Sequence, residues 1–190
     1  MLRLCSTSPT RAKLLDSFAI EYIQSKIEFD EESIKSNSAK SFVFSVVKGK
    51  LNSALNIYDL TLPILVADTV IATKKGKILR KAKNKSEAKE ILLEQSGSEI
   101  AIITASILKS KKLEFIDISA THYLFKKFDE EDLQNYLDSN EWQGKAGACM
   151  VEGFCKKYIR KVIGLESNAM GLPVEKIKPW LEFWCFLKKS

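Results

Sequence analysis

The sequence has few residues of the kinds that build zinc sites. Its four cysteines form no C-x-x-C pair, and it has a single histidine, His122. A zinc site would therefore have to be assembled from residues far apart in the chain. We interpret the cysteines as free thiols of a reducing compartment. His122 lies in an apolar segment, and we interpret it as a packed or hydrogen-bonded core residue rather than a general base.

The sequence also lacks the long apolar runs that a bilayer requires. No apolar stretch approaches the roughly 20 residues needed to span a membrane. The apolar start of the chain is ended at once by Ser6, Thr7, Ser8 and Pro9, so no signal peptide is indicated. No internal repeat or low-complexity segment is present. We therefore expect a cytoplasmic protein without a membrane partner.

The composition that remains is that of a globular protein with a basic balance. Hydrophobic residues make up 45% of the 190 residues, which suits a packed core. The length suits a single domain, 1–190, built as one compact body or as two small lobes around a cleft. The formal net charge of +6 suits a polyanionic ligand. Charge alone does not choose among a nucleotide, a nucleic acid and a membrane surface.

Short apolar segments alternate with segments of helical periodicity. This alternation, together with adjacent hairpins, predicts an α/β fold with a mixed sheet. Polar, loop-like segments are expected at 30–40 and 142–147. Strands are expected at 2–5, 22–29, 62–72, 77–79, 100–108, 113–125 and 156–163, and helices at 9–18, 42–55, 86–95, 130–137 and 174–187.

The first candidate site lies between the first strand and the first helix. Ser8 followed by Pro9 marks a helix start, and helix N-termini bind phosphate through free amides. The Ser6 and Ser8 hydroxyls and the Arg11 guanidinium add donors for phosphate oxygens. Locally, a simpler interpretation is favoured, in which Ser8 only caps the helix and Arg11 lies in water.

The second candidate is Asp68, an acidic residue inside an apolar strand. Such a group is costly to bury unless it is paired, bound to metal or functional. At the carboxyl end of a central strand it would point into the crevice where α/β proteins bind ligands, and could hold a metal or activate a water. A turn-capping role explains it equally well. Lys50 and Lys81 could neutralise phosphate nearby, although most lysines are solvated surface residues.

The third candidate is the small-residue segment 144–148, followed by Glu152. Small residues let the backbone approach a ligand closely, and a carboxylate can accept hydrogen bonds from a base. An ordinary loop is the alternative. The aromatic residues Trp180, Phe183 and Trp184 are spaced for a helix, and we interpret them as core or as a dimer surface rather than a base-stacking platform.

In their order along the chain, these segments resemble the Maf (septum-formation) family. The resemblance covers nearly the whole sequence. It rests on S-T-S-P-T-R-A-K-L-L at 6–15, the acidic pair at 30–31, Lys50, A-D-T-V at 67–70, Lys81 after a hairpin, S-G at 96–97, K-A-G-A at 145–148 with E-G at 152–153, and N-A-M-G-L-P at 168–173.

The sequence departs from the family pattern at several positions. Thr10 replaces the first of two arginines, and Arg80 and Ala82 replace the glycine and proline that flank the family's lysine. The histidine usual after S-G is absent, with Ile100 near that place. The loss at position 10 puts the strength and selectivity of phosphate binding in doubt.

The resemblance implies a fold and a reaction. The fold is a mixed twisted sheet flanked by helices, with two lobes around a nucleotide-binding cleft, as in Maf and ITPase proteins. The reaction is metal-dependent hydrolysis of a nucleoside triphosphate to the monophosphate and diphosphate. Members use a divalent cation, here Mg²⁺ or Mn²⁺, and are expected to form homodimers. A house-cleaning role linked to cell-division arrest is also implied.

The resemblance assigns roles to particular side chains. Ser6, Ser8, Arg11, Lys50, Lys81 and Lys145 would bind the triphosphate, with Arg11 and Lys81 counted among the catalytic groups. Glu31 and Asp68 would hold the metal, and Asp68 would also orient and deprotonate the attacking water. Thr10, Thr69 and Glu152 occupy the positions tied to base selectivity. Glu152 favours 7-methyl-GTP over dTTP or UTP, Thr10 matches neither branch, and the base stays open.

Two other functions are compatible with parts of the sequence. One is a non-catalytic nucleotide-binding regulator of septum formation, in which the changes at Thr10, Arg80 and Ala82 have removed activity. The other is a basic nucleic-acid-binding domain, which would need a cationic stripe interleaved with exposed aromatics. The lysines are dispersed and the aromatics have core spacing, so no stable nucleic-acid partner is expected.

Overall fold

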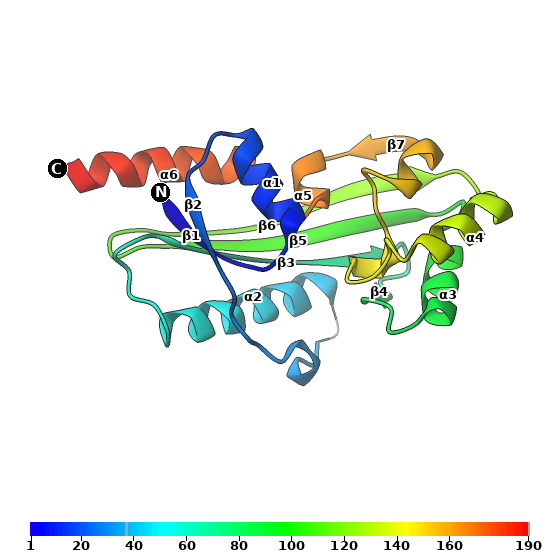
Figure 1. The fold of residues 1–190 in the computed structure, drawn as a ribbon, viewed down its shortest axis with the longest axis horizontal. Helices are drawn as coiled ribbons and strands as arrows, with labels where there is room; N and C mark the ends of the chain where they lie inside the picture. Colours follow the sequence, from blue (N-terminus) through cyan, green and yellow to red (C-terminus); the bar gives the residue numbers. More distant parts are fainter. Residues whose placement is uncertain (37, 190) are drawn as a thin grey trace.

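The computed structural model describes residues 1–36 and 38–189. Its strands and helices follow the predicted alternation (Figure 1). In chain order the elements are β1 (Leu2–Cys5), α1 (Pro9–Ser17), β2 (Tyr22–Ser25), the 3-10 helix η1 (Glu31–Ser33), α2 (Ala39–Leu55), β3 (Ile64–Thr73), β4 (Ile78–Leu79), α3 (Lys85–Gln95), β5 (Glu99–Lys109), β6 (Glu114–Phe125), α4 (Glu130–Ser139), the 3-10 helices η2 (Ala146–Ala148) and η3 (Phe154–Tyr158), β7 (Ile159–Ile163), α5 (Glu166–Ala169) and α6 (Val174–Lys189).

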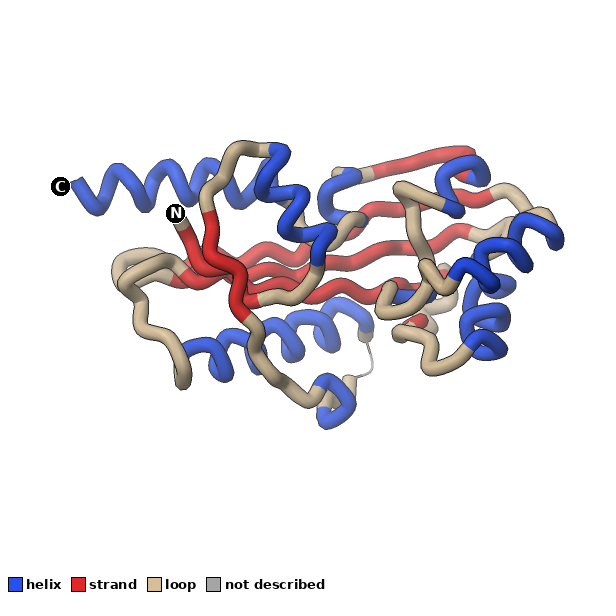
Figure 2. The backbone as a smooth tube through the Cα atoms, in the orientation of Figure 1, coloured by secondary structure: helices blue, strands red, loops and turns tan. Residues whose placement is uncertain are grey.

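The strands form one mixed, seven-stranded sheet in the order β2-β1-β3-β5-β6-β7, with β4 paired to β3. β1 runs parallel to both β2 and β3, whereas the other pairs are antiparallel. The long β3, β5 and β6 form the centre (Figure 2). The mixed α/β sheet flanked by helices is therefore confirmed.

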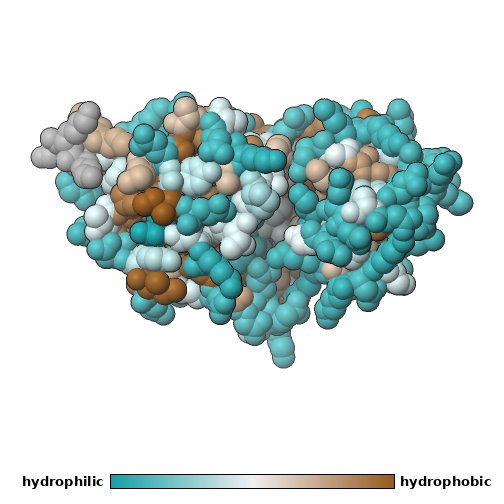
Figure 3. Space-filling view, viewed as in Figure 1, coloured by the Kyte–Doolittle hydropathy of each residue, from teal (hydrophilic) through white to brown (hydrophobic). Residues whose placement is uncertain are grey.

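Helices cover both faces of this sheet, and the core is divided accordingly. The apolar side of α2 packs on one face against β3 and β5. α1 and α6 cover the opposite face over β1, β3 and β5. α3, α4 and the segment before β7 build a third cluster at the far end. Figure 3 shows a hollow in the surface between two lobes. One lobe contains the cluster around α3 and α4, and the other contains the clusters under α1, α2 and α6.

The largest differences from the sequence-based expectation are the bounds of two strands and one additional α-helix. The strand expected at 22–29 ends at Ser25, because β1, its pairing partner, ends at Cys5 in register with Ser25. The strand expected at 156–163 begins only at Ile159, since η3 precedes it. The four-residue α5 was not expected, because so short a helix has no periodicity of its own in the sequence.

The interpretation of His122 as a core residue is wrong. Its side chain is 46% exposed, with Nδ1 3.8 Å from Glu99 Oε1. His122 lies between the buried Thr121 and Tyr123, so strand alternation turns it to the other face of β6. Trp180 stacks on Phe115 with ring centroids 5.1 Å apart, while remaining 39% exposed.

The cysteines are free thiols, as expected, with Cys5, Cys149 and Cys155 buried and Cys185 exposed. Within 1–36 and 38–189, no helix is both long enough and apolar enough to cross a membrane.

Candidate active site

A cavity of about 460 Å³ opens at the hollow between the lobes. This volume lies within the range of small-molecule sites. Its walls come from the β1–α1 loop, the middle of β3, the segment 143–152 and the turn that follows α5. All the candidate site residues named from the sequence line it: Ser6, Ser8, Thr10, Arg11, Glu31, Lys50, Asp68, Thr69, Lys81, Lys145 and Glu152.

Asp68 lines the cavity, but its position within the strand differs from the one considered from the sequence. It lies in the middle of β3 rather than at the carboxyl end of the strand. β1 pairs with β3 only at Ile64 and Leu65, and β4 pairs with the same edge only from Ile71, so this edge of β3 is uncovered at 66–70. The cavity lies along this open edge, and both Asp68 and its neighbour Thr69 line it although they point to opposite faces of the sheet.

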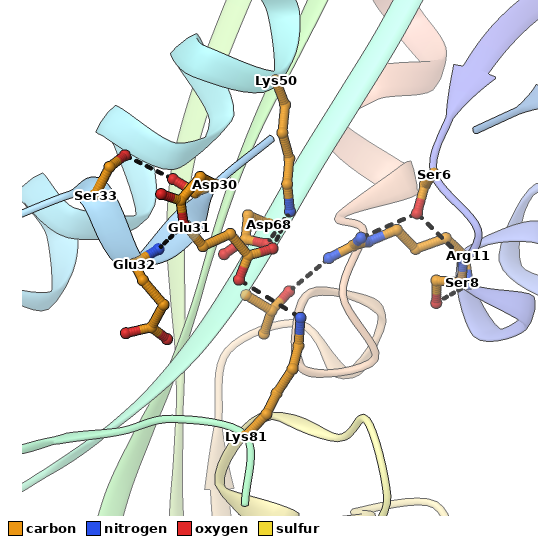
Figure 4. A network of polar contacts seen from close by, with 11 residues as sticks. Ser6, Ser8, Arg11, Asp30, Glu31, Glu32, Ser33, Lys50, Asp68 and Lys81 are labelled. Carbon is orange, nitrogen blue, oxygen red and sulfur yellow. Dashed lines mark hydrogen bonds and ion pairs between the residues drawn. The ribbon is translucent and has the colours of Figure 1, made fainter. Parts of the chain in front are cut away.

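On the α2 side, one lysine joins two carboxylates. Lys50 Nζ donates to Asp68 Oδ1 at 2.6 Å and to Glu31 Oε1 at 2.7 Å. Lys81 Nζ lies 3.5 Å from the other oxygen of Glu31. Figure 4 shows Lys50 and Lys81 approaching this carboxylate pair from different segments. Lys50 is thus not the solvated surface lysine that the sequence alone favours, whereas the side chain of Lys81 is 51% exposed and pairs with Glu31.

Charge compensation lowers the pKa of one member of this cluster, Glu31. Asp68 is 4% exposed. Burial alone would raise the pKa of Glu31, but the hydrogen bond and positive charge of Lys50, with the charge of Lys81, lower that pKa below its usual value. Glu31 is therefore ionised at neutral pH, and its carboxylate is available to a cation.

On the opposite face, Arg11 is held by neutral acceptors. Its Nε donates to the Gly171 carbonyl at 2.8 Å, Nη1 to Ser6 Oγ at 3.1 Å and Nη2 to Thr69 Oγ1 at 3.2 Å. Ser8 caps α1 by accepting from the Arg11 amide. Both sequence-based interpretations of Ser8 apply in part: it is a helix cap, and it also lines the cavity.

Arg11 does not lie in water, because its guanidinium is enclosed by these partners. Burial lowers its pKa, while the charges of Asp68 and Glu31 favour the protonated form. An arginine with a lowered pKa still keeps its charge at neutral pH. The cavity therefore contains a fixed cation on each side of β3.

The segment that contains Lys145 and Glu152 forms one wall of the cavity. Lys145 Nζ lies 3.6 Å from Glu152 Oε1. The backbone of Gly147 has φ +55°, and a Cβ at this position would lie 2.9 Å from Ile71. The Gly147 amide donates to the Arg80 carbonyl at 3.1 Å, and its carbonyl accepts from Gln95 Nε2 at 2.7 Å. Gly147 therefore lets this segment pack closely against Ile71 of β3, and its close approach to a ligand stays a prediction.

The sequence model of the family described as Maf-like protein matches residues 1–183. The chain belongs to the Maf family.

Three relatives of this chain are each named nucleoside triphosphate pyrophosphatase. One from a Nitratiruptor species is 54% identical over 93% of this chain and 96% of its own length. One from Helicobacter pylori is 41% identical over 92% of this chain and 91% of its own length. One from Campylobacter jejuni is 34% identical over 95% of this chain and 100% of its own length. Each of these three relatives matches at least 92% of this chain.

Three polar residues of this Maf site were missed or given no role from the sequence. Gln95 ends α3 and holds Gly147. Thr104 and Asn168 are buried behind Thr69 and hydrogen-bonded to the same network. The available signal was a polar residue inside an apolar segment, as at Thr104 within 100–108, the same signal that singled out Asp68.

The carboxylates of the Maf cavity suit a hard divalent cation. One oxygen of Glu31 and one of Asp68 lie within 2.7 Å of the same Lys50 nitrogen, so they are close enough to share a ligand. Within the described part of the chain, no group of three or more His, Cys, Asp or Glu residues is arranged to hold a metal. Mg²⁺ needs only one or two carboxylates when substrate phosphates supply further oxygens.

Proposed function

We infer that this chain is a nucleoside triphosphate pyrophosphatase, a hydrolase that releases the nucleoside monophosphate and diphosphate. The observation that supports this most directly is the cavity itself. Arg11, Lys50 and Lys81 surround it, and the nearly buried carboxylate of Asp68 lies among them. Three relatives that match nearly the whole chain are named for this activity.

Each side chain has a role that its position allows. Arg11 and Lys81 approach from opposite sides and would bind the triphosphate oxygens, together with Ser6, Ser8 and Lys145. Lys50, now on two carboxylates, would also donate to a phosphate. Cations fixed around the phosphates stabilise the charge on the departing oxygens without reorganisation.

Asp68 is the group that we assign to the water. Its carboxylate would orient a water molecule towards the α–β anhydride and accept its proton. The ammonium of Lys50, 2.6 Å away, holds this carboxylate in one orientation. No covalent intermediate is required by this arrangement.

A divalent cation, Mg²⁺ or Mn²⁺, would be held by Glu31 and Asp68. When bound, it supplies positive charge that offsets the charge of the triphosphate oxygens. The ionised state of Glu31 supports this assignment.

The base contacts are proposed for Thr10, Thr69 and Glu152. The Glu152 carboxylate can accept from the N1–H and N2–H groups of guanine and complement a cationic methylated base, which favours 7-methyl-GTP over dTTP or UTP. Its ion pair with Lys145 would have to loosen first. A cytoplasmic house-cleaning role linked to cell-division arrest follows from the family resemblance.

The test is diphosphate release from a panel containing dTTP, UTP, the common nucleoside triphosphates and 7-methyl-GTP, with Mg²⁺ or Mn²⁺. Asp68→Asn should lower kcat by at least about 100-fold, the usual effect of losing a general base. The matched control is Asp59→Asn, an exposed aspartate outside the cavity, which should keep native turnover. EDTA should abolish turnover, and added cation should restore it.

Other outcomes have definite meanings. A folded native protein that hydrolyses no member of the panel would contradict the enzyme and favour a nucleotide-binding regulator of septum formation. Turnover that survives Asp68→Asn would keep the reaction and refute the role given to Asp68.

A further inference from the structure

A chain of hydroxyl groups runs from Arg11 into the protein interior. Arg11 Nη2 contacts Thr69 Oγ1 at 3.2 Å, Thr69 Oγ1 contacts Thr104 Oγ1 at 2.9 Å, and Thr104 Oγ1 contacts the Asn168 carbonyl at 2.7 Å. Thr69 and Thr104 are direct cross-strand partners on β3 and β5, so their side chains meet on one face of the sheet.

Counting protons fixes the direction of every bond in this chain. The Asn168 carbonyl can only accept, so Thr104 donates its single hydroxyl proton there. Thr104 must then accept from Thr69, and Thr69 in turn accepts from Arg11. The donors therefore run in one direction, from Arg11 through Thr69 and Thr104 to Asn168.

Asn168 is itself anchored to the sheet. It is 1% exposed, and its Nδ2 donates to the Ile102 carbonyl at 3.1 Å and to Thr121 Oγ1 at 3.0 Å. Thr121 Oγ1 donates to the Leu165 carbonyl at 2.6 Å. The segment around α5 is thus fastened to β5 and β6 by buried hydrogen bonds, which are costly to leave unmade.

The same segment supplies a second contact to Arg11. The Gly171 carbonyl accepts from Arg11 Nε at 2.8 Å. Gly171 has φ +102°, and a Cβ there would lie 3.3 Å from Arg11 Nε and from Thr69 Oγ1. The left-handed backbone at 171 favours glycine, and a Cβ there would crowd the guanidinium.

These contacts leave Arg11 directed towards the cavity. A guanidinium has five N–H donors. Three are engaged by Ser6, Thr69 and Gly171, so one N–H on each terminal nitrogen has no partner among the described residues. Each of these N–H groups can donate a charge-assisted hydrogen bond to a phosphate oxygen.

We propose that Thr104 and Asn168 are positioning residues that fix the Arg11 guanidinium in the orientation that binds the triphosphate. Thr104 is 0% exposed and does not line the cavity, so it acts only through Thr69 and Arg11. This proposal rests on the triphosphate-binding role given to Arg11.

The proposal also narrows the role of Thr69. Its single hydroxyl proton is directed to Thr104, so Thr69 has none to donate to a base. Any effect of Thr69 on base selectivity is then exerted through its shape or through Arg11, not through a donated hydrogen bond.

The experiment measures binding of inorganic tripolyphosphate by calorimetry, which needs no turnover. Thr104→Val, which keeps the volume but not the hydroxyl, should weaken binding about tenfold, because a misoriented Arg11 would lose one charge-assisted hydrogen bond to the phosphate. Thr104→Ser, which keeps the hydroxyl, should stay within about twofold of native. Ser106→Ala is the matched control: Ser106 is 1% exposed on the same face of β5, and its hydroxyl has no hydrogen-bond partner among the described residues.

A double-mutant cycle separates positioning from general structural damage. In an Arg11→Lys background, Thr104→Val should cause no further loss, because the group it positions is gone. An equal loss in both backgrounds, or no loss in the native background, would overturn the proposal. Because a buried substitution can prevent folding, Thr104→Ala is prepared in parallel, and the same loss is expected from whichever variant folds.

Failure of the positioning proposal can be distinguished from failure of the proposed pyrophosphatase reaction. If the native protein binds tripolyphosphate but hydrolyses no nucleotide, the pyrophosphatase fails while the positioning of Arg11 is still measured. If the native protein does not bind tripolyphosphate at all, the positioning proposal fails with it.

Discussion

Lys50 is the residue whose contacts connect the two carboxylates of the cavity. Its side chain is 15% exposed and donates to both Asp68 and Glu31. Removing one partner of such a buried group leaves uncompensated charge, which costs more than the pair itself contributes. Lys50 therefore stabilises the protein as well as the site.

We expect Lys50→Met to destabilise the protein in a pH-dependent way. The lowered pKa of Glu31 means that its pairing stabilises the fold above the ordinary value of 4.5 and loses this effect as pH falls through the lower folded value. The variant should be less stable than native by about 3 kcal/mol at neutral pH. The difference should shrink below pH 4.5.

Urea unfolding of both proteins at neutral pH and at about pH 3 measures this difference. Lys48→Met, an exposed lysine on the same helix, is the control and should behave as native at both pH values. A destabilisation by Lys50→Met that does not change with pH would contradict the role of Glu31.

Single residues were predictable from the sequence only where they broke a pattern. Asp68 was noticed because a carboxylate inside an apolar strand is costly. Lys50 was not distinguishable from the other lysines until the family resemblance was considered, since partners 18 or 19 residues away leave no mark on a lysine. Thr104 and Asn168 were missed as site residues because their importance depends on which carbonyls and hydroxyls they meet.

At the scale of elements, the segment from Lys145 to Glu152 is joined to α3 and α4 by side-chain hydrogen bonds from Gln95 and Tyr136. Gln95, at the end of α3, is 0% exposed and donates to both the Ile91 and the Gly147 carbonyls. The bond to Gly147 connects this helix to the cavity wall. The position of Lys145 therefore depends on a residue that does not line the cavity.

We expect Gln95→Leu to raise KM for the nucleotide several-fold while changing kcat less, because the Lys145 segment would lose its fixed position without any loss of Asp68. A fall in stability of about 1–3 kcal/mol should accompany it, since the Gly147 carbonyl is left unpaired. Steady-state kinetics and thermal unfolding measure the two effects.

Gln134→Leu is the control for Gln95→Leu, since Gln134 is exposed and bonds only to Asp138 on its own helix among the contacts described for its side chain. It should change neither KM nor stability. An unchanged KM in Gln95→Leu would mean that the segment is positioned by its other contacts.

Elements with strong local signals were predicted well. α1 begins at Pro9 after its Ser8 cap, and α2, β3, β5 and β6 lie within a few residues of the expected bounds. The failures were β2, β7 and α5, whose extents are set by pairing partners and by buried hydrogen bonds rather than by periodicity. The sequence suggested that Asp68 would meet a ligand at the carboxyl end of a strand. The run 62–72 does not show that β1 ends early and leaves the edge of β3 open beside Asp68.

At the scale of the whole molecule, sequence patterns alone predicted an α/β fold, and the order of the motifs indicated the family. The arrangement that creates the site could not be read from either. The cavity depends on β1 ending early, on α1 and α2 lying on opposite faces, and on the turn after α5 returning beside Arg11. These are long-range relationships, and only the folded chain defines them.

The final prediction concerns association. α6 extends past the end of the sheet (Figure 1), and its Trp180 and Phe183 are 39% and 45% exposed. Exposed aromatic side chains close together are typical of contact surfaces. We expect the protein to form a homodimer through this helix, and Phe183→Glu to shift it towards the monomer in light scattering. Because none of the described α6 side chains lines the cavity, kcat/KM should stay native. A native protein that is monomeric at all concentrations, or a Phe183→Glu variant that remains dimeric, would exclude this surface as the dimer contact.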